Sequence, residues 1–160
     1  MSKKTNVQRI LEDAQVPYAL REYVVDTNDL SAVTAAQKLG LEPSQVFKTL
    51  VARGDKTGVL LVSLPGDAQL DLKALARLSR NKRVEMVPLK DVFQLTGYVR
   101  GGVSPLGLKK NFPYFLDELA FAYDQISLSA GARGLQVVLA AEDLATLTTA
   151  TRGDVSLFSD

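Results

Sequence analysis

The sequence predicts an α+β fold, formed by a single domain over residues 1–160 with a mixed, curved, barrel-like β-sheet and flanking helices. The chain has 160 residues, of which 46% are hydrophobic, enough to build one core. Segments typical of strands and of helices are mixed without a regular strand–helix–strand rhythm, which disfavours a purely parallel sheet. The longest apolar stretches, at 59–64 and 137–141, are far shorter than the roughly 20 residues that cross a bilayer.

The N-terminal segment predicts one helix and one strand. Thr5 or Asn6 can cap a helix whose apolar residues recur at helical spacing until Pro17 ends it. Residues 18–25 are rich in aromatic and β-branched side chains, which predicts a strand before the turn residues of 26–29. No apolar signal core follows the basic start of the chain, so we expect a cytoplasmic protein.

A helix and a hairpin are predicted next. Ser31 can cap the helix and Gly40 can end it in the left-handed conformation. Residues 45–52 and 59–64 are two apolar runs joined by 54–58, which contains two glycines. This arrangement predicts two buried strands with a hairpin tip between them.

The second half predicts shorter elements. Asp71 can cap a helix with one apolar face, residues 84–87 can form a strand, and Pro88 can begin a helix that Gly97 ends. The remaining expected elements are strands at 114–116, 125–128 and 135–139 and a helix at 142–147.

Residue types that are absent limit the chemistry. The chain has neither cysteine nor histidine. Thiolate nucleophiles, Ser-His-Asp and Cys-His catalysis and sulfur-ligated zinc are therefore excluded, and we expect neither a metal nor a cofactor. The net charge of +1 gives no general attraction to nucleic acid, so contact with RNA would depend on local basic clusters. Two such clusters are Arg77, Arg80, Lys82 and Arg83, and Lys109 with Lys110.

Lys48 is the most informative single residue. It interrupts the run 46–52, which is apolar on both strand faces and therefore typical of a central strand. A buried ammonium is costly unless an anion or other acceptors meet it. The lysine therefore either binds a ligand phosphate, or reaches the strand edge or a structural carboxylate.

Two loops and two polar side chains are further candidates. The loop 101–107 has three glycines and one proline, so its main chain can approach a ligand closely. The loop 129–134 adds Arg133, whose guanidinium suits phosphate or carboxylate. Each loop can equally be an ordinary turn. Tyr23 can line a pocket or belong to the core, and Ser104 with Lys48 can form a Ser-Lys dyad.

Three segments together resemble the YbaK/EbsC family of free-standing aminoacyl-tRNA deacylases. They read VFKTLV at 46–51, TGYVRGGVSPLG at 96–107 and ARGL at 132–135. Segments 69–73 and 82–86 look similar too, so the resemblance covers nearly the whole chain in order.

The resemblance implies a fold related to the editing domain of prolyl-tRNA synthetase and a hydrolase that removes wrong amino acids from tRNA. Cys-tRNA(Pro) is the implied substrate, with Cys-tRNA(Cys) and Ala-tRNA(Pro) as further candidates, and prolyl-tRNA synthetase is a candidate partner. The cysteine thiol of the substrate is expected to attack its own ester. By resemblance, Lys48, Gly101 and Gly102 are the catalytic set. The implied substrate-binding residues are Tyr23, Ser104, Pro105, Ser129, Gly131, Arg133 and Gln136.

One position departs from the family pattern. Gln136 stands where well-known family members carry an aspartate, which makes the amino-acid specificity an open question. Two alternatives therefore remain beside the deacylase. They are a noncatalytic module that binds tRNA or a synthetase, and a Ser-Lys esterase for small esters.

Overall fold

The computed structural model describes residues 4–159. The α-helices are α1 Asn6–Asp13, α2 Ala32–Leu39, α3 Leu72–Ser79, α4 Leu89–Thr96 and α5 Ala141–Thr148, and the 3-10 helices are η1 Pro43–Gln45 and η2 Glu118–Ala122. The strands are β1 Tyr18–Glu22, β2 Phe47–Gly54, β3 Gly58–Pro65, β4 Gln69–Leu70, β5 Val84–Met86, β6 Tyr114–Asp117, β7 Gln125–Ala132, β8 Leu135–Ala140, β9 Thr151–Gly153 and β10 Ser156–Leu157.

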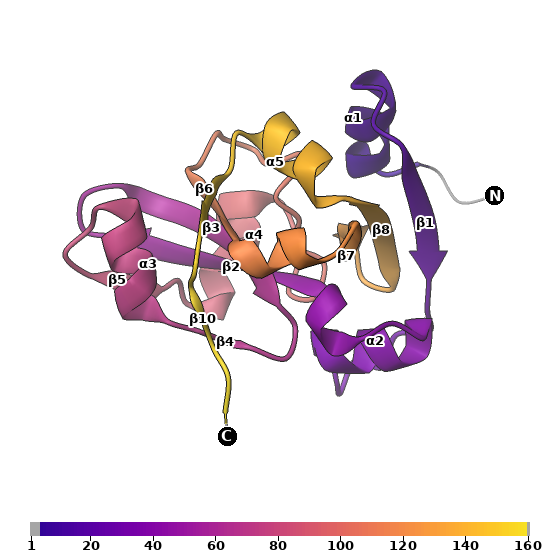
Figure 1. The fold of residues 1–160 in the computed structure, drawn as a ribbon, viewed down its shortest axis with the longest axis horizontal. Helices are drawn as coiled ribbons and strands as arrows, with labels where there is room; N and C mark the ends of the chain where they lie inside the picture. Colours follow the sequence, from indigo (N-terminus) through magenta and orange to yellow (C-terminus); the bar gives the residue numbers. More distant parts are fainter. Residues whose placement is uncertain (1–3, 160) are drawn as a thin grey trace.

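The strands form three sheets (Figure 1). The largest has the order β5-β2-β3-β6-β9 and is mixed, because β5, β2 and β3 pair antiparallel whereas β6 pairs parallel with β3 and β9. The second has the antiparallel order β1-β8-β7, and β10 pairs with β4 in the third. A parallel bridge between Val46 and Ser127 joins the two larger sheets. The predicted α+β fold with a mixed sheet is confirmed, although the sheet is divided rather than continuous.

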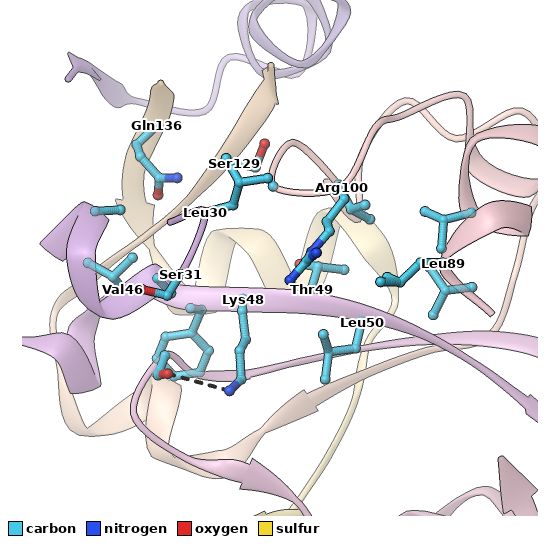
Figure 2. A pocket seen from close by; sticks show the side chains of 18 of the residues that line it. Leu30, Ser31, Val46, Lys48, Thr49, Leu50, Leu89, Arg100, Ser129 and Gln136 are labelled. Atoms are coloured by element: carbon cyan, nitrogen blue, oxygen red, sulfur yellow. Dashed lines mark hydrogen bonds between the residues drawn. The ribbon is translucent and has the colours of Figure 1, made fainter. Parts of the chain in front are cut away.

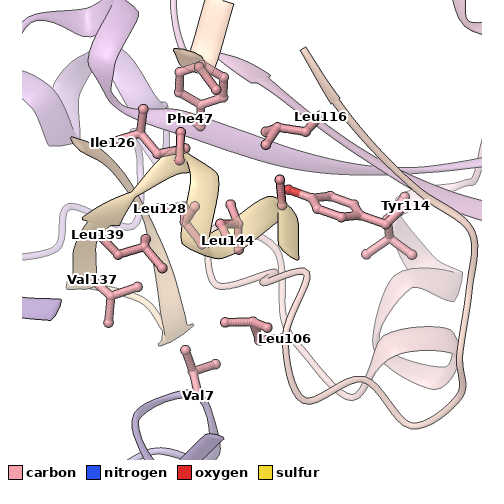
Figure 3. Packing of buried hydrophobic residues seen from close by; sticks show 14 of the residues in the cluster. Val7, Phe47, Leu106, Tyr114, Leu116, Ile126, Leu128, Val137, Leu139 and Leu144 are labelled. Atoms are coloured by element: carbon pink, nitrogen blue, oxygen red, sulfur yellow. The ribbon is translucent and has the colours of Figure 1, made fainter. Parts of the chain in front are cut away.

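Two apolar clusters hold the sheets together. The larger lies between the two main sheets and includes Phe47 and Leu61 from one sheet and Leu128 and Leu139 from the other, with Leu144 of α5 beside them (Figure 3). Burial of such side chains is worth about 1.5–3 kcal/mol each, so this cluster fixes the position of one sheet against the other. The smaller cluster packs α3 against the opposite face of the large sheet.

Most predicted helix limits are confirmed, but α1 ends at Asp13, before the predicted stop at Pro17, because the chain turns at Gln15 with φ +58°. Thr5 is the N-cap of α1, and its side chain forms a capping box with Gln8. Ser31 and Asp71 cap α2 and α3 as predicted. Gly40 and Gly97 end α2 and α4 in the left-handed conformation, as predicted.

The first strand is shorter than predicted. It ends at Glu22 rather than continuing to residue 25, because its partner β8 begins at Leu135, opposite Glu22. A last main-chain hydrogen bond joins the Tyr23 N–H to the Gly134 carbonyl, and Val24 is then 82% exposed.

None of the helices within residues 4–159 has both the length and the apolar character that crossing a membrane requires.

Candidate functional site

The site is built on an open edge of β2. β5 pairs with β2 only at Ala52, Arg53 and Gly54, so the preceding part of that edge has no partner strand among the described residues beyond the bridge at Val46. The Val46 carbonyl accepts a hydrogen bond from Gly66 on the β3 side, whereas the Val51 carbonyl accepts one from Val87 on the opposite side. Because main-chain groups alternate along a strand, those of Thr49 face the open edge.

A cavity of about 360 Å³ lies at this edge (Figure 2). Residues 46–51 all line it, so the cavity reaches both faces of β2 around its unpaired edge. Its other lining residues are Tyr23, Leu30, Ser31, Ala32, Ala35, Gly66, Met86, Val87, Leu89, Val92, Arg100, Gly101, Val103, Ser129 and Gln136. The volume lies within the range of small-molecule sites.

Lys48 lines this cavity, and its side chain ends in an ammonium group. Its Nζ donates hydrogen bonds to the carbonyl oxygens of Gly66 and Ala68, at 3.4 and 2.5 Å. Burial of the half-buried side chain lowers the pKa of the Lys48 ammonium, and the nearby charge of Asp67 opposes part of that shift. An ammonium has three donors, so one remains for a ligand. Among the described residues, main-chain carbonyls and not a structural carboxylate hold the amine.

The glycine loop reaches the cavity through Gly101 rather than Gly102. The Gly102 N–H donates to the Val99 carbonyl at 2.9 Å, and Gly101 has φ +85°, which is the pattern of a tight turn with glycine at its third position. The expected pair of free glycine N–H groups is therefore not formed, because Gly102 is buried with its amide bonded within the turn. Ser104 and Pro105 are also buried and do not line the cavity.

The β7–β8 hairpin supplies Ser129 and Gln136. Gln136 is buried at 6% exposure, and its Oε1 accepts a hydrogen bond from Ser127 Oγ at 2.8 Å. No acceptor within residues 4–159 pairs with its amide nitrogen, so this donor is available to a ligand. The Ser129 hydroxyl accepts from the N–H of Gly131, which lies in a β-bulge and packs against Tyr98 outside the cavity.

Arg133 supports the glycine loop instead of lining the cavity. Its side chain is exposed, and its Nε donates to the Arg100 carbonyl at 2.7 Å. This bond ties the β7–β8 turn to the loop that contains Gly101. The structure therefore brings together Lys48, Gly101, Tyr23, Ser129 and Gln136, and leaves Gly102, Ser104, Pro105, Gly131 and Arg133 outside the cavity.

The cavity carries positive charge. Lys48 and Arg100 line it, whereas none of the described lining residues is Asp or Glu. In Figure 2 the Arg100 side chain extends from its loop toward β2 near Thr49. Arg100 belongs to the motif at 96–107 but was not among the predicted site residues. The apolar lining residues Leu30 and Leu89 were not predicted either, because no sequence pattern separates them from other apolar residues.

No three Asp, Glu, His or Cys side chains are grouped as a metal site would require anywhere in residues 4–159.

Comparison with known proteins identifies the family of this chain. The model of the aminoacyl-tRNA editing domain family matches residues 28–147, which contain all of the cavity lining except Tyr23. The chain belongs to this family. Within it, the chain is 49% identical over 146 residues to EbsC of Enterococcus faecalis, provisionally named a Cys-tRNA(Pro)/Cys-tRNA(Cys) deacylase. That similarity covers 91% of this chain and 89% of EbsC.

Two further relatives connect the chain with prolyl-tRNA synthetase. A solved structure, provisionally described as a trans-editing enzyme for prolyl tRNA synthetase, superimposes with a TM-score of 0.80 at 27% identity. The superposition covers 97% of this chain and 99% of the chain in that structure. Proline–tRNA ligase of Streptomyces coelicolor is 32% identical over 84 residues, which are 52% of this chain and 15% of the ligase.

Proposed function

We propose that this protein hydrolyses mischarged tRNA in trans, with Cys-tRNA(Pro) and Cys-tRNA(Cys) as its substrates. The single observation that carries the proposal is that Lys48 and Gly101 line the same cavity. The name given to EbsC supports the choice of cysteine. The cavity has the size of a small-molecule site, which suits the terminal nucleoside and its ester-linked amino acid.

Lys48 and Arg100 would hold the anionic part of the substrate. The remaining donor of Lys48 suits a phosphate oxygen of the terminal nucleotide, and Arg100 offers a planar guanidinium at the cavity mouth. Gly101 allows the ester carbonyl to approach the main chain. None of the described lining residues carries a carboxylate, so the substrate's α-amine would meet uncharged acceptors, which are the carbonyl oxygens on the open edge of β2 and lining hydroxyls such as that of Ser129.

The proposed reaction uses the substrate's own nucleophile. The cysteine thiol attacks the ester carbonyl carbon, so that a C–S bond forms and the bond to the ribose oxygen breaks. The thiol proton passes to the departing ribose hydroxyl, and water then opens the thiolactone to give free cysteine. Holding the thiol close to the carbonyl accelerates this attack. In favourable intramolecular reactions, such proximity lowers the activation barrier by about 7–11 kcal/mol.

The arrangement of Ser104 argues against the Ser-Lys esterase. Its hydroxyl is buried and accepts a hydrogen bond from the Leu106 N–H, whereas Lys48 donates to Gly66 and Ala68. Within residues 4–159 no hydrogen bond links Ser104 to Lys48, and Ser104 does not line the cavity. A serine nucleophile needs its base within hydrogen-bond reach.

A panel of charged tRNAs tests the proposal. We expect the purified protein to deacylate Cys-tRNA(Pro) and Cys-tRNA(Cys), and Lys48→Met to lower kcat/KM at least 100-fold without loss of folding. Lys38→Met is the matched control, because Lys38 is exposed on α2 and does not line the cavity. A folded wild-type protein that binds tRNA but hydrolyses none of the panel would instead be a noncatalytic binding module.

We further infer that the protein acts in the cytoplasm, where tRNA is charged, and that prolyl-tRNA synthetase is a candidate partner in selecting the tRNA. The similarity to a trans-editing enzyme for that synthetase supports the partnership. Deacylation of Cys-tRNA(Pro) measured with and without the synthetase tests it, and an unchanged KM would count against it.

A further inference from the structure

Helix α4 carries exposed apolar side chains beside the cavity mouth. Leu89 is 62% exposed and Phe93 is 56% exposed, and their separation of four residues places them on the same side of the helix. Met86, at the end of β5, is 44% exposed. Leu89 and Met86 line the cavity, so the apolar surface is continuous with it. We call Met86, Leu89 and Phe93 the α4 shelf.

A lysine covers the aromatic member of this shelf. Lys109 Nζ lies 5.5 Å from the centroid of the Phe93 ring, within the range of a cation–π contact. The Lys109 side chain packs next to Gly97, where α4 ends. Arg100 stands at the cavity mouth and is exposed. The α4 shelf thus offers an exposed aromatic ring next to Lys109, and Arg100 stands at the mouth of the adjoining cavity.

These features favour single-stranded nucleic acid over a protein as the occupant. Stable protein interfaces bury about 800 Å² on each partner and are depleted of lysine at their centres. Three side chains next to two cations are too small a surface for that. In contrast, proteins that bind single strands combine aromatic rings, on which bases stack, with basic residues that meet the phosphates.

The size of the cavity indicates which nucleotides would lie on the shelf. At about 360 Å³, the cavity suits the terminal nucleoside with its aminoacyl group and leaves no room for the preceding nucleotides. Those unpaired nucleotides must leave through the mouth, where the exposed lining residues include Met86, Leu89 and Arg100.

We infer that the α4 shelf is a binding surface for the unpaired nucleotides that precede the terminal one at the 3′ end of tRNA. A base stacks on Phe93, and Lys109 meets the adjoining phosphate. This inference rests on the proposed function, because it takes tRNA as the ligand. It concerns a surface outside the cavity, so binding can be measured separately from hydrolysis.

The test compares binding of an uncharged RNA hairpin that ends in an unpaired CCA with binding of adenosine 5′-monophosphate. We expect Phe93→Ala to weaken RNA binding about tenfold, the range that loss of one stacked base gives. Adenosine monophosphate affinity should change less than about twofold. Phe93→Tyr keeps an aromatic ring and should bind RNA like the wild type. Lys109→Gln should reduce the slope of log affinity against log salt concentration by about one.

Phe158→Ala is the matched control, because Phe158 is 51% exposed and does not line the cavity. The inference is overturned if Phe93→Ala binds RNA like the wild type, if it weakens both ligands equally, or if the wild type does not bind the RNA. Binding that depends on Phe93 in a protein that hydrolyses no aminoacyl-tRNA would support the shelf while contradicting the proposed function.

Discussion

Gln136 presents an amide to a cavity in which the other polar side chains are hydroxyls or cations. Ser127 fixes the amide by donating to its oxygen, which leaves the NH₂ group to meet the ligand. A carboxylate at this position would attract a protonated α-amine, whereas an amide nitrogen offers only donors. We therefore expect this residue to influence how the amino group of the substrate is recognised.

Gln136→Asp should make the enzyme more selective for a free amine. We expect the ratio of kcat/KM for Cys-tRNA(Pro) over its N-acetylated form to rise about tenfold, because an ion pair with the α-ammonium is gained only with the free amine. Gln136→Asn keeps the amide and is the control for shortening the side chain. A ratio that is the same in Asp and Asn variants would show that this position does not contact the amine.

At the scale of elements, a chain of buried hydroxyls links three strands under the cavity. Tyr114 of β6 donates to Ser63 of β3 at 2.7 Å, and Ser63 is 2.7 Å from the Thr49 hydroxyl of β2. Burial raises the pKa of the Tyr114 hydroxyl well above its ordinary value, so the group stays protonated and continues to donate. Ser63 is the central member, with 0% exposure.

Ser63→Ala should therefore cost more stability than Tyr114→Phe. The first change removes the shared partner of two hydroxyls and should lower the free energy of unfolding by about 2–3 kcal/mol, whereas the second leaves the Ser63–Thr49 bond in place and should cost about 1 kcal/mol. Urea denaturation of both variants measures the difference. Equal losses would mean that Ser63 does not couple the three strands.

Elements that depend on local signals were predicted better than elements that depend on long-range pairing. Caps at Ser31 and Asp71 act through hydrogen bonds within a few residues, so the sequence contains the whole interaction. β4, β9 and β10 were not predicted, since each has only two or three residues and none has a strand pattern like the one at 84–87. Their positions depend on partners far along the chain.

The same distinction applies to the site. The apolar run interrupted by Lys48 and the glycine-rich loop 101–107 indicated two of the lining segments, and the resemblance to a family pointed to Gly101 within that loop. The open edge of β2 could not be predicted, because it exists only where β5 stops pairing at Ala52. Ser104 belongs to the same loop as Gly101, yet the turn directs it into the core, which residue types alone do not indicate.

At the scale of the whole molecule, the C-terminal segment helps to hold the main chain that contacts Lys48. Asp117, with 0% exposure, accepts hydrogen bonds from the Val155 N–H at 2.9 Å and from the Ser156 hydroxyl at 2.7 Å. β10, which begins at Ser156, pairs with β4, and β4 directly follows Ala68, whose carbonyl holds the Lys48 amine. Asp117 and the C-terminal strand are both distant from Lys48 in the sequence. Together they thus support the segment whose carbonyl holds the Lys48 amine.

Asp117→Ala should release this segment. Loss of the carboxylate leaves three donors without their acceptor, including the Leu119 N–H, and should lower the free energy of unfolding by about 3 kcal/mol. Amide hydrogen exchange should accelerate at the residues of β4 and β10, and kcat/KM should fall as the Lys48 amine loses a fixed acceptor. Asp124→Ala, at an exposed aspartate, is the control. Faster exchange in β4 with unchanged kcat/KM would show that the Ala68 carbonyl does not position Lys48 for catalysis, whereas unchanged exchange would show that Asp117 does not hold the C-terminal strand in place.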